Sequence, residues 1–201
     1  DILMDGATAL PSVSPGDDVR LDFDVLNQGT APTDPDVHMR WYWGTSSGST
    51  ANYIASGSLG TLNGLSAGES ERETDASWLI PELSAGTYWL TGVIDWDGCI
   101  PESNEGNNTR SESFTVLNSD LIAYGVSVSD TTVDPGQSVT VNWTAKNQGQ
   151  AGAGSTQQGV MWSGNSTISR SDSLLEKEYL GSMSVNQTSP ESHTITIPAD
   201  A

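Results

Sequence analysis

Apolar and polar residues alternate strictly in two segments of the chain. Residues 19–25 read Val-Arg-Leu-Asp-Phe-Asp-Val, and residues 139–145 read Val-Thr-Val-Asn-Trp-Thr-Ala. A period of two residues places every second side chain on the same face of a strand. An antiparallel strand with one buried face and one face in water has this pattern. We therefore expect a half-buried strand in each segment, with its large apolar side chains directed inward.

The two strands lie inside a longer internal repeat. A Pro-Gly turn precedes each strand, at 15–16 and 135–136, and Asn-Gln-Gly follows it, at 27–29 and 147–149, so that the copies differ by a constant 120 positions. A repeat of this length is large enough for each copy to form its own core. The sequence therefore predicts two tandem domains, 1–117 and 121–201, joined by a short linker at 118–120.

Gly, Pro, Asn and Ser clusters divide the rest of the chain into short alternating segments, and no segment has a helical period. In the first domain we expect strands at 2–10, 18–26, 37–44, 53–59, 70–80, 86–95 and 109–117. Seven short strands in a domain of this size are typical of an immunoglobulin-like sandwich. The prediction is an all-β fold of two tandem immunoglobulin-like β-sandwiches. Tyr88, at the start of the sixth strand, fits a tyrosine corner, in which the phenol bonds to upstream backbone.

The second domain stops early in this sequence. Its segment Ile195-x-Ile197-Pro198 matches Trp78-x-Ile80-Pro81 of the first domain, but counterparts of the last two strands do not follow before Ala201. A sandwich that lacks two strands exposes part of its core and two sheet edges. We expect either that the chain continues in the intact protein or that a partner supplies the missing strands, as in donor-strand complementation.

Charge excludes whole classes of partner. The chain of 201 residues has 7 Lys and Arg against 26 Asp and Glu, a formal net charge of −19. Such a surface repels nucleic acid and anionic lipid, and no apolar run is long enough for membrane insertion. Cys99 is the single cysteine, so no disulfide can form within the chain.

The order and spacing of several segments resemble the CARDB family, the cell-adhesion-related domain found in bacteria. The resemblance rests on four segments, 133–141, 146–149, 167–175 and the hairpin 95–108. It covers all of the first domain and the available part of the second. It implies a β-sandwich module of large secreted or cell-surface bacterial proteins, arrayed in tandem beside catalytic or calcium-binding domains, with an adhesive or spacer role.

The hairpin between the sixth and seventh strands has the highest density of acidic side chains. Oxygen ligands at close spacing suit a hard cation, which makes calcium the candidate cofactor, although folding requires none. The alternative is that the Asp and Asn side chains cap their own turn backbone while the Glu side chains point into water. The candidate metal ligands are Asp95, Asp97, Glu102, Asn104, Glu105 and Asn107.

Trp96 lies between two of those aspartates, where an exposed indole could stack on a sugar ring. No hydrolase, metalloprotease or phosphate-binding motif occurs, and His38 and His193 have no nucleophile at a recognisable spacing. We therefore expect a non-catalytic spacer or stalk, secreted or at the cell surface, that contacts neighbouring domains of its own long chain and a cell-surface protein or polysaccharide. The alternative is a calcium- or glycan-binding accessory module attached to a secreted enzyme.

Overall fold

The computed structural model describes residues 2–7, 10, 12–33, 37–54, 61–62 and 64–199. All regular structure in this part of the chain is β-strand, as predicted, and none of it is a helix that could span a membrane. The chain divides into two compact units, Asp1–Leu117 and Asn118–Ala201. Two predicted strand segments fall partly on positions 8–9 and 55–60, which lie outside the described residues.

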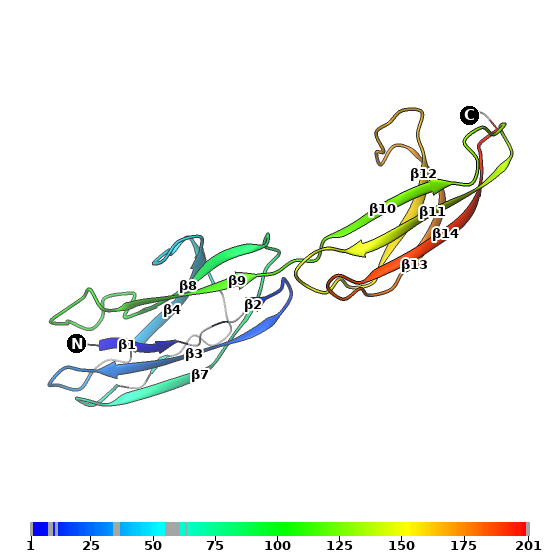
Figure 1. Cartoon of the computed structure of the whole chain (residues 1–201). Helices are drawn as coiled ribbons and strands as arrows, with labels where there is room; N and C mark the ends of the chain where they lie inside the picture. Colours follow the sequence, from blue (N-terminus) through cyan, green and yellow to red (C-terminus); the bar gives the residue numbers. More distant parts are fainter. Residues whose placement is uncertain are drawn as a thin grey trace. The chain divides into compact units, whose positions relative to one another are not determined.

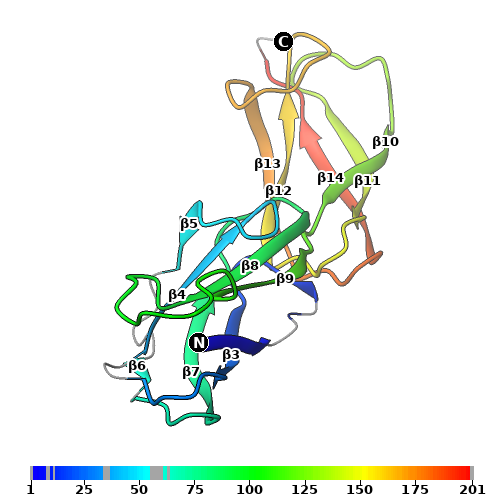
Figure 2. The same ribbon diagram turned by 90° about the vertical axis from the view of Figure 1, so that its left-hand side faces the viewer.

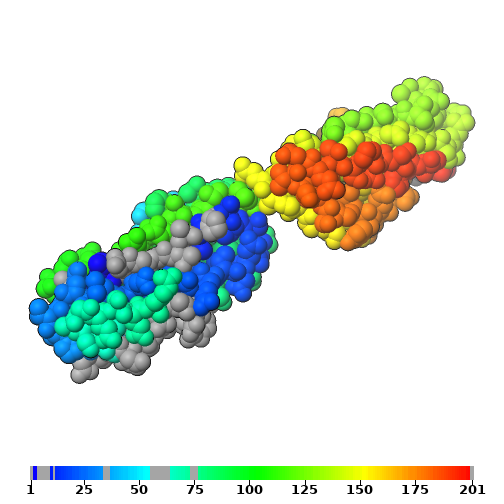
Figure 3. Space-filling model, turned by 60° about the horizontal axis from the view of Figure 1, so that its bottom comes forward, coloured from blue at the N-terminus to red at the C-terminus, as the bar shows by residue number. Residues whose placement is uncertain are grey.

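The first unit consists of two sheets packed face to face (Figures 1 and 2), the arrangement of an immunoglobulin-like sandwich. One sheet has the order β1-β3-β7, formed by Ile2–Ala7, Asp18–Asn27 and Ser70–Leu79. The other has the order β2-β9-β8-β4-β5, formed by Ser12–Val13, Thr109–Val116, Gly86–Ile94, Val37–Gly44 and Asn52–Tyr53, and β6 (Thr61–Leu62) also pairs with β4. The space-filling view shows β3, in blue, beside β7, in blue-green (Figure 3).

The N-terminal segment of this unit contributes to both sheets. β1 pairs antiparallel with β3, and β2 then pairs parallel with β9 through Ser12 with Thr115 and Val13 with Val116. The Leu117 N–H donates to the Val13 carbonyl at 2.8 Å and extends this short parallel pairing. The second strand and the last strand of the unit are therefore held side by side.

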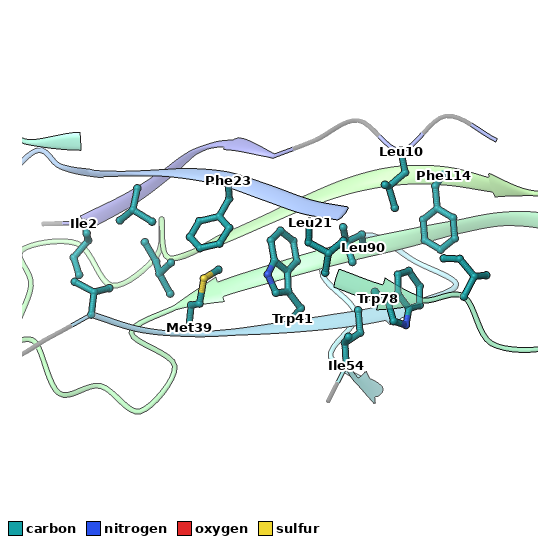
Figure 4. Close-up of a cluster of buried hydrophobic side chains, with 14 of the residues drawn as sticks. Ile2, Leu10, Leu21, Phe23, Met39, Trp41, Ile54, Trp78, Leu90 and Phe114 are labelled. Atoms are coloured by element: carbon teal, nitrogen blue, oxygen red, sulfur yellow. The ribbon is translucent and has the colours of Figure 1, made fainter. Parts of the chain in front are cut away.

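The core of the first unit lies between the two sheets, and the predicted alternation of β3 is confirmed. Leu21, Phe23 and Val25 are at most 2% exposed. Leu21 and Phe23 point toward the opposite sheet (Figure 4). Trp41 of β4 meets them there at 1% exposure, with its ring 5.7 Å from that of Phe23 in an edge-to-face contact. Edge-to-face aromatic packing adds to the stabilisation from area burial alone.

Tyr88 forms the predicted tyrosine corner. Its hydroxyl donates to the carbonyl of Ser84 at 3.1 Å, four residues upstream. The ring packs against the core beside Phe114 and Trp43. The side chain thus holds the turn that opens β8 against the sandwich.

The second unit has a three-stranded and a two-stranded sheet among its described residues. The first has the order β10-β11-β14, formed by Leu121–Val128, Ser138–Asn147 and Thr188–Thr196. The second pairs β12 (Thr156–Trp162) with β13 (Ser173–Leu180). The inward residues of β11, Val139, Val141, Trp143 and Ala145, are buried as the alternation predicts. No described strand occupies the positions that β8 and β9 occupy in the first unit.

A buried asparagine explains why the Asn-Gln-Gly sequence occurs twice. Asn27 and Asn147 both have 0% exposure. The Asn27 side-chain amide donates to the carbonyls of Ala31 and Leu65 at 2.8 and 3.0 Å, and its Oδ1 accepts from the Gly29 N–H at 3.0 Å. Asn147 repeats all three bonds at the equivalent positions of the second unit. In both units the asparagine connects the end of a core strand to two loops.

Residues 118–120 are fastened to the same turn of the second unit. The Asp120 N–H donates to Asn147 Oδ1 at 3.1 Å, and the Gln150 N–H donates to the Asn118 carbonyl at 2.9 Å. A Cβ atom at Gly149 would lie 2.4 Å from the Asp120 nitrogen and 2.5 Å from the Asn118 oxygen. Because both neighbours are backbone atoms, only glycine allows this close approach.

Candidate metal centre

The loop between β8 and β9 begins with an aspartate in an unusual environment. Asp95 follows the last residue of β8, has a positive φ of 45°, and is only 6% exposed. Among residues other than glycine, Asp and Asn adopt the left-handed backbone conformation most readily. The carboxylate turns back into the loop and accepts the N–H groups of Cys99 at 2.9 Å and Ile100 at 3.3 Å. The fold therefore places a carboxylate at the base of the hairpin, largely out of water.

Two glutamates complete a cluster around Asp95. One carboxylate oxygen from each of Asp95, Glu102 and Glu105 lies within 4.8 Å of the others. The Glu102 N–H donates to Glu105 Oε1 at 3.0 Å, which closes a turn within the second half of the loop. Glu102 Oε2 also accepts the backbone N–H of Ile2 at the start of β1. The N-terminal strand therefore helps to hold the glutamate in place.

Asn108 lies in the same acidic hairpin and belongs to this site, although it was not among the six predicted ligands. It is 8% exposed, its amide nitrogen donates to Glu102 Oε1 at 2.9 Å, and its Oδ1 has no hydrogen-bond partner in the described structure. Its backbone carbonyl accepts the Ile94 N–H at 2.9 Å, so that the base of the hairpin fixes its place. A buried amide oxygen without a partner is costly, and a bound cation would offset this cost. Its neighbour Asn107 has the same residue type, so the sequence alone did not distinguish the two.

Asp97 and Asn104 make other contacts. Asp97 Oδ2 is 2.7 Å from His38 Nδ1 of β4, and with Cys99 these residues form a separate group. Asn104 is exposed, and its Oδ1 accepts the Gly106 N–H at 3.0 Å, which caps the turn. Asn107 is half-buried. The structure thus gathers three of the four predicted carboxylate ligands, Asp95, Glu102 and Glu105, close together.

The pKa values of the two aspartates shift in opposite directions. Burial raises the pKa of Asp95; the N–H groups of Ile100 and Cys99 partly oppose it, and the charges of Asp97 and Glu105 raise it further. The hydrogen bond to His38 lowers the pKa of Asp97. The Cys99 thiol bonds to Asp97, which raises its pKa and keeps it a thiol. Asp95 is therefore the carboxylate that would gain most from a cation.

Asp95→Asn is expected to raise the melting temperature of the metal-free protein at neutral pH. A raised pKa means that the folded state holds the proton more tightly than the unfolded chain, so ionisation of Asp95 lowers stability as pH rises through that pKa. The carboxamide oxygen can still accept the two N–H bonds and carries no charge. Melting curves in chelator from pH 3 to pH 8 should show the variant and the wild type converging at the acid end. A variant less stable than wild type at pH 7 would contradict this account.

Trp96 is 41% exposed, but one face of its ring is covered. The Arg40 guanidinium carbon lies 3.1 Å from the ring centroid, a cation–π contact. A sugar that stacked on this face would have to displace the arginine. Trp41 and Trp78 are buried, and Trp43 and Trp89 are partly buried, so none of these presents an open ring.

A family model identifies the chain. The model of the CARDB family matches residues 1–112, more than half of the sequence. The chain belongs to the CARDB family. CARDB domains are non-catalytic, adhesion-related modules, and the immunoglobulin-like first unit agrees with this membership.

The chain is also similar to several solved structures. One is a crystal structure from Pyrococcus furiosus described in complex with di-metal ions, with 19% identity over 58% of this chain and 87% of that one, at a TM-score of 0.46. A solution structure of that domain is 21% identical in sequence. It covers 58% of this chain and 94% of its own, with a TM-score of 0.43. A structure described as a chaperone–tip adhesin complex of fimbriae is 13% identical in sequence. The match covers 98% of this chain and 94% of that one, with a TM-score of 0.32. No curated protein matches the chain.

Proposed function

We propose that this CARDB chain is a structural, non-catalytic module of a secreted or cell-surface adhesion protein, and that its acidic hairpin binds calcium. The hairpin would act as a cation-stiffened end of the first sandwich. Neighbouring domains of the same polypeptide, and a cell-surface protein or polysaccharide, are the proposed partners.

One observation carries the calcium proposal. Asp95, Glu102 and Glu105 present oxygens within 4.8 Å of one another, and the unpartnered Oδ1 of the buried Asn108 belongs to the side chain bonded to Glu102. Three carboxylates this close repel one another unless a cation or protons intervene. Carboxylate and amide oxygens are the ligands that calcium takes in proteins.

The donor set favours a hard cation over a transition metal. No histidine or cysteine belongs to the Asp95 cluster, whereas zinc and copper sites usually contain nitrogen or sulfur ligands. Calcium also tolerates irregular geometry and additional water ligands, which suits a loop better than the strict octahedron of magnesium.

The expected effect of calcium is moderate. Sites of extracellular modules have dissociation constants of about 10⁻⁴ to 10⁻³ M. At ten times the dissociation constant, binding would stabilise the first unit by about 1.4 kcal/mol. This amount can order the loop and secure the start of β1 through Glu102, and folding would not depend on it.

Calcium titration of the whole 201-residue protein tests the proposal. We expect a saturable change in tryptophan fluorescence, because Trp96 adjoins Asp95, together with a rise of several degrees in the melting temperature of the first unit in 10 mM calcium relative to chelator. Asp95→Asn and Asn108→Ala should remove or strongly reduce both responses.

Glu82→Gln is the matched control. It removes the same charge from an exposed position in the turn before β8, whereas the candidate site follows the other end of that strand. An equal response in the control and in Asp95→Asn would show that calcium acts only as a general counter-ion. No response in the wild type would end the calcium proposal and leave the structural role alone.

A further inference from the structure

A second group of metal-ligand side chains lies beside the Asp95 cluster and shares none of its members. His38 on β4, and Asp97 and Cys99 in the loop between β8 and β9, present one ligand atom each within 4.8 Å of one another. Their donor atoms are a ring nitrogen, a carboxylate oxygen and a thiol sulfur. His38 and Asp97 are 59 residues apart in sequence, so that the fold alone brings this group together.

The backbone that carries these side chains is fixed by its own hydrogen bonds. The pairing of β4 with β6 and β8 holds the strand of His38. In the loop, Asp95 Oδ1 accepts the Cys99 N–H at 2.9 Å, and the Asp95 carbonyl accepts the Gly98 N–H at 2.9 Å. Gly98 has a positive φ of 64° and completes the tight turn between Asp97 and Cys99. A cation can therefore bind here at a small cost in conformational entropy.

The three side chains already contact one another. His38 Nδ1 is 2.7 Å from Asp97 Oδ2, and the Cys99 thiol hydrogen-bonds to the Asp97 carboxylate. In a tetrahedron with metal–ligand bonds of about 2.0–2.3 Å, neighbouring donor atoms are roughly 3.3–3.7 Å apart. Separations between 2.7 and 4.8 Å bracket this spacing, so that small side-chain rotations suffice to complete the site.

We propose that His38, Asp97 and Cys99 form a zinc site in the first unit, independent of the calcium site proposed above. Zinc takes nitrogen, sulfur and carboxylate ligands, and a site with three protein ligands leaves the fourth position to water. The neutral imidazole binds through Nδ1. Binding replaces the hydrogen bonds to Asp97 by metal–ligand bonds, and the thiol proton passes to water, because a coordinating thiol is held as the thiolate.

The donor set and its position both favour zinc over a hard cation. Calcium and magnesium take oxygen ligands, whereas imidazole and thiolate suit zinc. The side chains of His38 and Asp97 are 39% and 23% exposed and Cys99 is exposed, so an ion can enter from solvent. The net charge of −19 raises the concentration of cations near the surface. A bound ion would connect β4 directly to the hairpin.

Cobalt titration of the untagged 201-residue protein tests the proposal, with excess calcium present throughout to occupy the Asp95 cluster. Cobalt replaces zinc in sites of this kind and absorbs in the near ultraviolet when a thiolate binds it. We expect a saturable thiolate-to-cobalt charge-transfer band that disappears when zinc is added. Because Cys99 is the single cysteine, no other residue can give this band. Cobalt at the group formed by Glu178, Glu191 and His193 would be silent.

Three variants locate the ion. Cys99→Ser should abolish the band, and His38→Gln should weaken cobalt and zinc binding by at least the roughly 10–100-fold that loss of an outer-shell partner costs. Glu105→Gln is the matched control and should bind cobalt as the wild type does. It removes a carboxylate from the Asp95 cluster, while its carboxamide oxygen can still accept the Glu102 N–H. Zinc should also slow the reaction of the Cys99 thiol with an aromatic disulfide several-fold.

Three results would overturn the proposal. One is the absence of the band in the wild type. Another is a His38→Gln protein that binds cobalt as tightly as the wild type, which would place the thiolate-bound ion elsewhere. The third is dimerisation on addition of cobalt, measured by sedimentation, which would show that the Cys99 thiols of two chains share the ion. Melting curves in chelator check the fold of each variant, and the wild-type band and thiol protection remain decisive if His38→Gln fails to fold.

Discussion

Trp41→Ala is expected to lower the free energy of unfolding of the first unit by about 3–5 kcal/mol, the largest effect of any single change considered for this chain. The side chain is 1% exposed and packs edge-to-face on Phe23, so its removal leaves a cavity between the two sheets (Figure 4). Denaturant unfolding followed by circular dichroism measures the loss. The transition of the second unit should stay unchanged, because that unit has a separate core.

Trp41→Phe is the informative control. The indole Nε1 is buried and has no hydrogen-bond partner in the described structure, so the indole carries an unpaired donor. Phenylalanine removes this donor and retains an aromatic ring, and we expect it to cost clearly less than alanine. If phenylalanine were as harmful as alanine, the ring volume would matter less than an unrecognised partner of the nitrogen.

Asn147→Ala is expected to destabilise the second unit by about 3 kcal/mol. The substitution breaks the amide bonds to the carbonyls of Ala151 and Met183 and leaves the Gly149 and Asp120 N–H groups without their acceptor. A buried polar group that loses its partner costs about 1–3 kcal/mol, and some of these groups can regain water. Thermal unfolding of the variant should show an early transition for the second unit.

Asn27→Ala provides the parallel experiment in the first unit, where the asparagine makes three of the same bonds. Gln148→Ala is the neighbouring control, because that side chain donates only an exposed bond to Asp120. We expect a loss below about 1 kcal/mol there. Comparable losses for Gln148→Ala and Asn147→Ala would mean that the turn as a whole, and not the buried amide, stabilises the unit.

The strand pattern was predictable because burial acts on every second residue. The inward faces of β3 and β11, the tyrosine corner and the all-β class all follow from local alternation and turn residues. The sequence also marked the Asn-Gln-Gly repeat without giving its reason. Its cause is a set of bonds from one amide to loops that are 36 to 38 residues away in sequence.

The metal centre was predictable only in part, because its members come from different strands and turns. Proximity in sequence grouped Asp97 with Asp95, whereas the fold directs Asp97 to His38 on β4, 59 residues away. Asn108 was not among the predicted ligands, because only the pairing of Ile94 with Asn108 at the hairpin base shows that it is buried. The sequence pattern therefore locates an acidic loop. Which of its side chains come together depends on tertiary contacts.

The parallel pairing of β2 with β9 has a mechanical consequence for the first unit. Tension on a chain pulls β9 toward its C-terminal end and β2 toward its N-terminal end, so that the two strands slide past each other lengthwise. The bonds around Val13, Val116 and Leu117 are then loaded together in shear and cannot open one after another like a zipper. A sandwich tied in this way resists stretching, a property that would serve a protein anchored at one end and pulled at the other.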